Sequence, residues 1–249
     1  MVEKKYQKPK LTYFFITLCV IIFLLELFFE YYYGEDFLKD IFYNFGFSFY
    51  NILKGELWVS LTSIFIHASP EHLVLNIIAL YFFGKVVEQQ LGRKKFLIAF
   101  FLSSIFADLF VIASTLLGFS SITVPTIGAS AAIFGLMGVA MIVNPLEFTF
   151  YPYLIPIPIV LVALIYTLYN IASFLLVLTG QASSDISYVS HIGGLISGLL
   201  LGFREEGSKK GFIIILFILF LLLATPFIFA VMSFLENFNY INILSSFFK

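Results

Sequence analysis

One serine and one histidine in otherwise apolar stretches are the residues of this chain best suited to catalysis. Ser130 follows Gly128 and Ala129 at the start of one hydrophobic stretch, and His191 lies near the start of another. Polar side chains at membrane depth are costly and usually face protein or a water-filled cavity. A serine hydroxyl becomes a good nucleophile when an adjacent base takes its proton, and neutral histidine suits that role near neutral pH. The two residues therefore predict a catalytic Ser-His pair.

Two further polar residues could stabilise the oxyanion that forms in acyl transfer. His72 and Asn76 are four residues apart, so they lie on one side of a helix. Together with backbone N–H groups at the start of the stretch after Gly128, they could donate hydrogen bonds to the developing negative charge. We therefore predict that His72 and Asn76 form an oxyanion site.

Carboxylates are poorly placed to complete a triad. Asp185 lies outside the stretch that holds His191, and Asp108 lies in the middle of a different one. The residues therefore favour a Ser-His dyad over a triad, and one Asp within the membrane is too few for an aspartyl protease, which needs two. The role of Asp108 stays open between a protonated group, a partner of a neighbouring span and a residue unrelated to activity. His67 is interpreted as an interfacial or loop residue and not as a ligand.

Composition places the chain among polytopic membrane proteins. Hydrophobic residues make up 61% of it, charged residues only 12%, and it contains 33 Phe. Such a sequence cannot cover the surface of a soluble globular protein. The single Cys19 excludes an intramolecular disulfide and a cysteine-based metal site, and the three His residues lack the His-Glu-x-x-His pattern of zinc proteases. We expect no metal ion, cofactor or nucleic-acid partner; the expected partners are the lipid bilayer and transmembrane proteins.

Seven apolar stretches are expected to form membrane helices, with boundaries good to a few residues. They are residues 11–32, 69–89, 95–117, 130–144, 153–178, 187–203 and 211–234. A bilayer is crossed by about 20 helical residues. The fourth stretch ends at Asn144-Pro145, so its helix would have only about 15 residues. Such a helix can begin below the membrane surface, with a water-filled cavity above it.

Basic residues indicate how the spans are oriented. Eleven of the 14 Lys and Arg residues fall on one side of the seven spans. The positive-inside rule then predicts a cytoplasmic N-terminus and an extracytoplasmic C-terminus in the cell membrane. We divide the chain into a basic cytoplasmic leader (1–10), a six-span core (11–203), and a cytoplasmic linker with the seventh span and a short outer tail (204–249). Within the core, residues 33–57 carry aromatic residues at helical spacing, which predicts an interfacial segment, either a partly immersed loop or a peripheral helix.

This orientation puts the polar residues at one depth. Ser130 begins an inward-running span, His191 lies about one turn into another, and the two oxyanion candidates lie in the first two turns of a third. Gly194 and Gly198 share a helix side with His191, since they follow it at i+3 and i+7. A Gly-x-x-x-Gly pair allows a second helix to approach closely, and the span that begins at Ser130 is itself rich in small residues. We therefore expect His191 to approach Ser130.

At these residues the chain resembles the rhomboid family of intramembrane serine proteases. The matching motifs run in order through spans two to six: His72-x-x-x-Asn76, Val87-Glu88 with Leu91-Gly92, Gly128-Ala129-Ser130 followed by Ile133-Phe134-Gly135, and His191-x-x-Gly194-x-x-x-Gly198. The resemblance implies Ser130 as nucleophile, His191 as base, His72 and Asn76 at the oxyanion site, and Phe134 stacked on His191. It also implies a rhomboid-like six-helix bundle plus one additional C-terminal transmembrane helix, and cleavage of transmembrane proteins within or near their spans.

Three positions depart from the pattern of that family. Ala131 stands where the commonest motif has Gly, Phe134 replaces a frequent Tyr, and the Trp-Arg pair of the family is Trp58-Val59 here. None of these changes removes a catalytic group, but the missing Arg bears on how its loop is anchored. An alternative is a catalytically impaired rhomboid-like protein that binds transmembrane clients. The small residues around Ser130 could also be only a packing face, whereas a transporter has little support because no pair of interrupted helices occupies matching halves.

Overall fold

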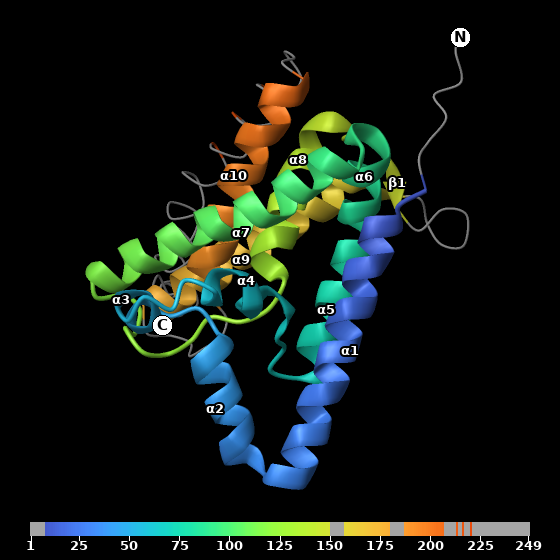
Figure 1. Ribbon diagram of the computed structural model, residues 1–249. Helices are drawn as coiled ribbons and strands as arrows, with labels where there is room; N and C mark the ends of the chain where they lie inside the picture. The colour runs from blue at the N-terminus through green and yellow to red at the C-terminus, as the bar shows by residue number, and fades with distance from the viewer. Residues whose placement is uncertain are drawn as a thin grey trace, which may run out of the picture.

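The computed structural model describes residues 8–149, 157–179 and 187–206, together with the single positions 213, 216 and 220. These residues form a bundle of helices (Figure 1). Four of its spans are long and apolar enough to cross a membrane: α1 (Lys10–Tyr33), the continuous segment Pro70–Leu91, α7 (Arg93–Leu116) and α9 (Ile159–Leu178). The chain is therefore an integral membrane protein, and the predicted all-helical membrane class is confirmed.

The span Pro70–Leu91 consists of α5 (Pro70–Ala79), a π-helical turn η2 (Leu80–Gly84) and α6 (Lys85–Leu91). It begins sharply, because Pro70 occupies the first turn and the Oγ of Ser69 accepts the backbone N–H of His72 at 3.2 Å. It ends at Gly92, whose φ of 83° suits a glycine and reverses the chain into α7.

Helix α8 (Ser130–Val143) is the centre of the bundle. It has 14 residues, and its 12 residues from Ala131 to Ile142 are all buried. At a rise of about 1.5 Å per residue, it is shorter than the hydrocarbon core of a bilayer, which is about 30 Å thick. The helix ends before Pro145, which lacks the N–H needed to continue it. The predicted short fourth helix is therefore confirmed.

Helix α10 (Tyr188–Glu206) packs against α8 at very short range through small residues. A methyl group at Gly194 would overlap the carbonyl oxygen of Ala131, and one at Gly198 would overlap that of Gly135. Conversely, a methyl group at Gly138 would lie 2.7 Å from the carbonyl oxygen of Leu195. Glycine is thus needed on both helices for their backbones to approach this closely, as the Gly-x-x-x-Gly spacing suggested.

The segment between the first two spans is divided into several short helices. They are α2 (Glu35–Phe45), α3 (Phe49–Leu53), α4 (Val59–Thr62) and the 3-10 turn η1 (Ser63–Phe65). The helical spacing predicted within residues 33–57 is realised as one continuous helix only from Glu35 to Phe45. The chain then extends at Gly46, where a side chain would meet Pro125 and Ile127 at 2.7 and 2.8 Å, and Phe47 pairs with Thr126 as an isolated β-bridge.

The fifth span begins later than predicted. Residues 157–158, which were expected to be helical, form the strand β2 (Ile157–Pro158), which pairs with β1 (Phe148–Thr149) in an antiparallel ladder. Helix α9 starts only at Ile159, because Pro158 sits at its N-cap with an extended ψ of 135°. Three of the expected features lie outside the described residues. They are Asp185, most of the linker and tail at 204–249, and the predicted seventh span except for its single described positions 213, 216 and 220.

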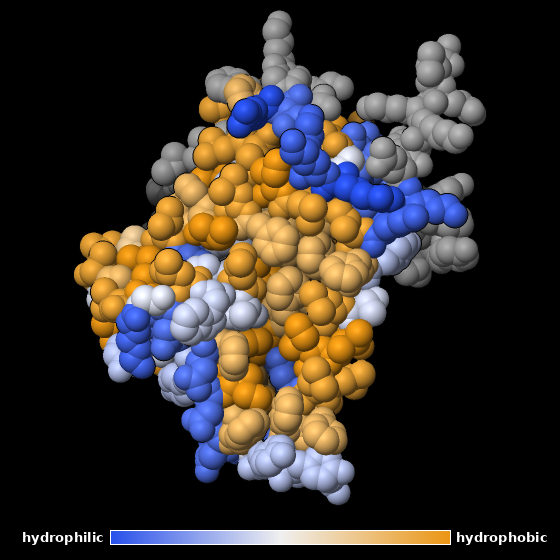
Figure 2. Space-filling model, in the orientation of Figure 1, coloured by the Kyte–Doolittle hydropathy of each residue, from blue (hydrophilic) through white to orange (hydrophobic). Residues whose placement is uncertain are grey.

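The surface is consistent with a membrane environment. Figure 2 shows an apolar belt around the middle of the molecule, with hydrophilic residues gathered where α6 meets α7 and over α2. Many large apolar side chains of the spans are exposed, among them Leu24 on α1 and Leu109 on α7. Such exposure is unfavourable in water but neutral against lipid tails, which are equally apolar.

Candidate active site

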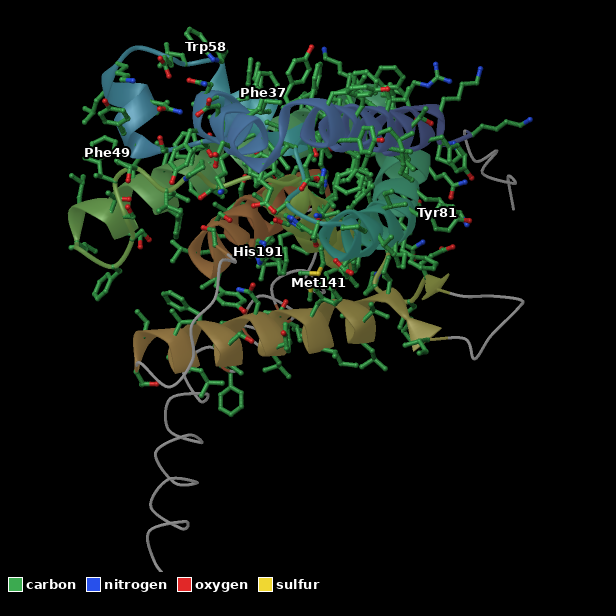
Figure 3. All side chains as sticks on the ribbon, turned by 90° about the horizontal axis from the view of Figure 1, so that it is seen from below. Phe37, Phe49, Trp58, Tyr81, Met141 and His191 are labelled. Carbon is green, nitrogen blue, oxygen red and sulfur yellow. The ribbon has the colours of Figure 1, made fainter. Side chains whose placement is uncertain are left out.

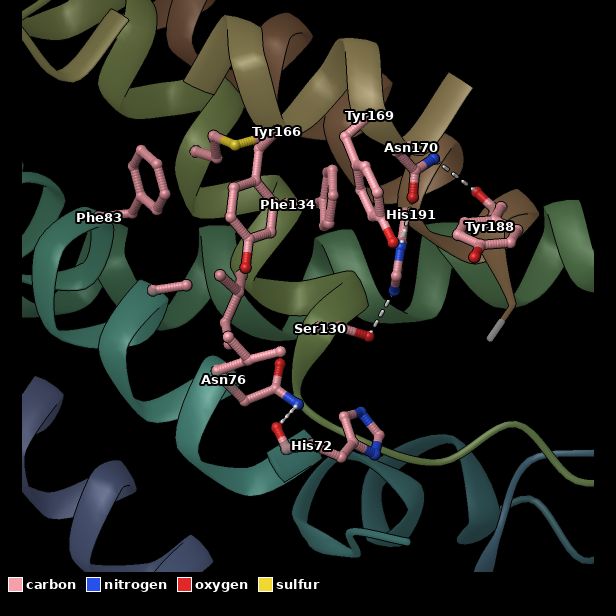
Figure 4. Close-up of a pocket in the computed structure, with 14 residues that line it drawn as sticks. His72, Asn76, Phe83, Ser130, Phe134, Tyr166, Tyr169, Asn170, Tyr188 and His191 are labelled. Carbon is pink, nitrogen blue, oxygen red and sulfur yellow. Dashed lines mark hydrogen bonds between the residues drawn. The ribbon is translucent and has the colours of Figure 1, made fainter. Parts of the chain in front are cut away.

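A pocket of about 160 Å³ opens between α5, α8, α9 and α10. The polar and aromatic residues that line it come from all four helices and from η2, which contributes Phe83 (Figure 4): His72, Asn76, Phe83, Ser130, Phe134, Tyr166, Tyr169, Asn170, Tyr188 and His191. Seen from below, α9 runs along one side of the bundle, and His191 lies between it and the other helices (Figure 3). The predicted catalytic pair and the two predicted oxyanion residues therefore line the same pocket.

Ser130 and His191 are joined by a hydrogen bond. Ser130 is the first residue of α8, and its Oγ lies 2.7 Å from Nε2 of His191, in the first turn of α10. His191 is buried, with 9% of its surface exposed. The close packing of α8 on α10 brings these two helix starts together, so the approach expected from the sequence is observed.

Asn170 of α9 holds the other side of the imidazole, and the sequence analysis missed it. Its Oδ1 lies 2.6 Å from Nδ1 of His191, and its Nδ2 donates to the carbonyl oxygen of Tyr188 at 3.2 Å. Since a carbonyl oxygen only accepts, the amide nitrogen must face Tyr188, and Oδ1 then accepts a hydrogen bond from the N–H at Nδ1. His191 therefore presents an unprotonated Nε2 to Ser130. A lone Asn in the middle of an apolar span was the available signal.

Phe134 fixes the plane of the histidine ring. The two rings are stacked, with centroids 4.5 Å apart and an interplanar angle of 9°. Phe134 and Ser130 are four residues apart on α8, so one helix face supplies both the hydroxyl and the stacking surface. The Phe that replaces a Tyr at this position keeps this contact.

His72 and Asn76 lie beside the backbone that leads into α8. Gly128 has a φ of 109°, and a methyl group there would lie 2.6 Å from Nε2 of His72. The Nδ2 of Asn76 donates to the carbonyl oxygen of His72 at 3.0 Å, which leaves its second N–H available. Glycine is thus required at residue 128 both for the backbone angle and for the close approach of His72.

Comparison with known proteins shows to which family the chain belongs. The sequence model described as Rhomboid domain matches residues 54–206, more than half of the chain. The chain belongs to the rhomboid family. Rhomboid protease GluP of Bacillus subtilis is 30% identical over 207 residues, which cover 81% of this chain and 36% of that protein. Rhomboid protease GlpG of Haemophilus influenzae is 27% identical over 214 residues, 82% of this chain and 95% of that protein.

Some relatives carry other names. Inactive RHOMBOID-like protein 8 of Arabidopsis thaliana is 36% identical over 83 residues, which cover 33% of this chain and 22% of that protein. The chain thus spans about a third of the length of GluP and nearly all of GlpG. Because one of these relatives is named inactive, family membership alone does not decide whether a rhomboid cleaves its substrates.

The departures from the rhomboid pattern are accommodated by packing. Val59, in place of the Arg, is fully buried against Phe47 and Val111 of α7, whereas Trp58 is about half exposed. An apolar contact therefore anchors this loop. Ala131 is buried with its carbonyl oxygen against α10.

Asp108 and His67 do not line this pocket. Asp108 is buried in α7, and its Oδ2 has no hydrogen-bond partner among the described residues. His67 lies in the loop before α5, as interpreted from the sequence, but it is almost completely buried. In the part of the chain that the structure describes, no three His, Cys, Asp or Glu side chains gather in a way that could hold a metal ion.

Proposed function

We propose that the chain is an intramembrane serine endopeptidase that cleaves transmembrane proteins within or near their spans. The observation that carries this proposal is the 2.7 Å hydrogen bond from Ser130 to His191, in a pocket at the start of a short, buried helix. Family membership and relatives named as proteases support it. A hydroxyl, an oriented base and candidate oxyanion donors together are what acyl transfer needs.

The proposed reaction follows from the tautomer of His191. Nε2 takes the proton of Ser130 while Oγ attacks the carbonyl carbon of the substrate, forming a tetrahedral oxyanion. When the carbon–nitrogen bond breaks, the same proton passes from Nε2 to the leaving amine, and an acyl-enzyme remains. Water then attacks the ester with His191 again as base, which releases the carboxylic acid and restores Ser130. Asn170 keeps Nδ1 protonated throughout.

The oxyanion is proposed to form beside His72 and Asn76. Both line the same pocket as Ser130, and the first N–H groups of α8 have no partner within their own helix. These donors are held by the helices before the substrate arrives, so they need little reorganisation during the reaction.

The orientation in the membrane is also a proposal. Lys94, Lys95 and Arg204 gather around a second pocket at the end of α10 that lies far from His191. If this basic end faces the cytoplasm, Ser130 lies nearer the outer face of the cell membrane, and the N-terminus is cytoplasmic.

The test is covalent labelling of the purified protein by a serine-directed electrophile, read together with cleavage of a transmembrane substrate. Wild type should be labelled at Ser130 and should cleave. Ser130→Ala should lose both signals, His191→Ala should nearly do so, and Ser121→Ala, at an exposed loop serine, should match wild type. Full cleavage by Ser130→Ala would overturn the proposal. A folded wild-type protein that binds substrate without labelling or cleavage would instead support the client-binding alternative.

A further inference from the structure

A buried carboxyl group links the first helix to the loop that precedes α5. Glu26 lies on α1, with 4% of its surface exposed. Its Oε2 accepts the backbone N–H of His67 at 3.3 Å, and its Oε1 has no hydrogen-bond partner among the described residues. A buried carboxyl costs free energy, and here it is only partly compensated. Its contact with the loop therefore asks for a reason beyond packing.

The loop residue that Glu26 holds is itself almost completely buried. Only 1% of the surface of His67 is exposed. Its Nδ1 lies 3.2 Å from the carbonyl oxygen of Phe65, so Nδ1 carries a proton, and Nε2 is a bare acceptor without a partner in the described part of the chain. Burial and the neighbouring His72 lower the pKa of His67 to about 4, so the ring is neutral near pH 7.

This neutral ring contacts the ring of His72, the candidate oxyanion residue. The ring centroids of His67 and His72 are 5.2 Å apart, with an interplanar angle of 61°. The His72 ring therefore has His67 and the backbone at Gly128 as neighbours. The backbone N–H of His72 donates to the Oγ of Ser69. A shift of the loop at residue 67 would be passed directly to the ring that lines the pocket.

We infer that Glu26 and His67 are positioning residues, which hold the His72 ring in its place at the oxyanion site. The inference rests on the proposed function, since it presumes that His72 acts in catalysis. Glu26 fixes the backbone of the loop, and the His67 ring transmits that position to His72 by direct contact. The role requires an acceptor oxygen at residue 26 and does not require a charge.

A double-mutant cycle on kcat for a transmembrane substrate tests this inference in the full-length protein. Glu26→Leu alone should lower kcat about ten- to a hundredfold with KM unchanged, because a small displacement of a catalytic group is expensive. In a His72→Ala background the same change should alter kcat by no more than about twofold, because the group through which Glu26 acts is gone. Glu26→Gln keeps an acceptor oxygen and should remain close to wild type.

Cys19→Ala is the matched control for packing. Cys19 is on the same helix and equally buried, with 2% exposed, but it lies away from the loop. Its effect should multiply with that of His72→Ala. If Glu26→Leu also multiplies with His72→Ala, or leaves kcat unchanged, the inference is wrong.

Two further measurements keep the result interpretable. His67→Ala leaves the backbone N–H that Glu26 binds but removes the ring, and it should show the same lack of additivity with His72→Ala. This second cycle decides the matter if Glu26→Leu fails to fold. Ser130→Ala must abolish cleavage in the same assay. If cleavage depends on Ser130 but the effects of Glu26→Leu and His72→Ala on kcat multiply, only the positioning role is overturned. Cleavage by Ser130→Ala would instead overturn the proposed function.

Discussion

Helix α1 is tied to the rest of the protein by a buried glutamate at each end, and the two are bonded very differently. Near its start, Glu88 of α6 accepts the N–H of Leu11 at 2.9 Å and both the N–H and hydroxyl of Thr12 at 2.8 Å. The Nε of Arg93 lies 3.8 Å from the Oε1 of Glu88. Near its other end, Glu26 accepts one hydrogen bond of 3.3 Å, and its second oxygen has no partner among the described residues.

The difference separates a structural contact from one next to the pocket. Pro9 offers no side-chain cap to α1, so Glu88 supplies acceptors for N–H groups that the helix cannot satisfy itself. A fully satisfied buried network rigidifies the structure, whereas an incompletely satisfied group asks for a functional explanation. We therefore expect the Glu88 end of α1 to control stability. The other end, where Glu26 contacts the loop at His67 and which we call the loop end, is expected to control turnover.

The largest expected effect is at the satisfied end. Glu88→Leu leaves two buried donors of Thr12 without an acceptor, at about 1–3 kcal/mol each, and also removes the acceptor of the partly buried Leu11 N–H. It should therefore lower the melting temperature steeply or prevent folding. Turnover per folded molecule should stay close to wild type. Glu88→Gln keeps one acceptor oxygen, so its melting temperature should lie between those of wild type and Glu88→Leu. A folded, stable Glu88→Leu enzyme with slow turnover would contradict the division between the two ends.

His72→Ala should show the opposite pattern. Removing one oxyanion donor typically costs on the order of 10²–10³ in rate, about 3–4 kcal/mol. Cleavage normalised to folded protein should fall by that amount, with a nearly unchanged melting curve in the same detergent, and Asn76→Ala should behave alike. Unchanged normalised turnover with a lowered melting temperature would make the residue a packing residue instead.

Part of this arrangement follows from sequence patterns and part does not. The spans are readable because an apolar stretch of membrane length has few alternatives, and Pro145 marks the end of the short α8. Asn170 was overlooked because lipid-facing and core-facing residues are equally apolar, so the pattern of α9 does not indicate which side faces the bundle. The Glu26 contact joins residues 41 positions apart, and no local pattern in the sequence reports it.

Asn170→Leu should have a smaller effect than His72→Ala. It removes the acceptor that holds the tautomer of His191, while leaving the nucleophile, the base and the stacked Phe134 in place. We expect kcat to fall on the order of tenfold to a hundredfold. Asn170→Asp keeps an acceptor oxygen and should be less impaired. Thr167→Val, one turn earlier on α9, removes a buried hydroxyl that donates to the carbonyl oxygen of Ala163 and should leave kcat unchanged. Equal losses in Asn170→Leu and Thr167→Val would indicate that α9 is merely sensitive to polar deletion.

The smallest expected effect concerns pH at the loop end, where His67 is buried as a neutral ring beside Glu26 and His72. Its pKa is about 4 in the folded protein, against the usual 6.5, chiefly because of burial and secondly because of His72. Between these two values the unfolded chain binds a proton that the folded protein does not. Stability should therefore fall as the pH drops from about 6.5 towards 4, by at most about 1.4 kcal/mol per pH unit from this residue.

His67→Gln removes this titration, because glutamine binds no proton in that range. Melting curves at closely spaced pH values should show that wild type loses stability more steeply than His67→Gln between pH 6.5 and 4, and that the two curves run parallel above pH 7. Other groups that titrate in the same window are present in both proteins, so they cancel in the difference. Curves that stay parallel across the whole range would mean that the His67 ring is accessible to protons in the folded state, and that the loop end is less tightly packed than its contacts with Glu26 and His72 imply.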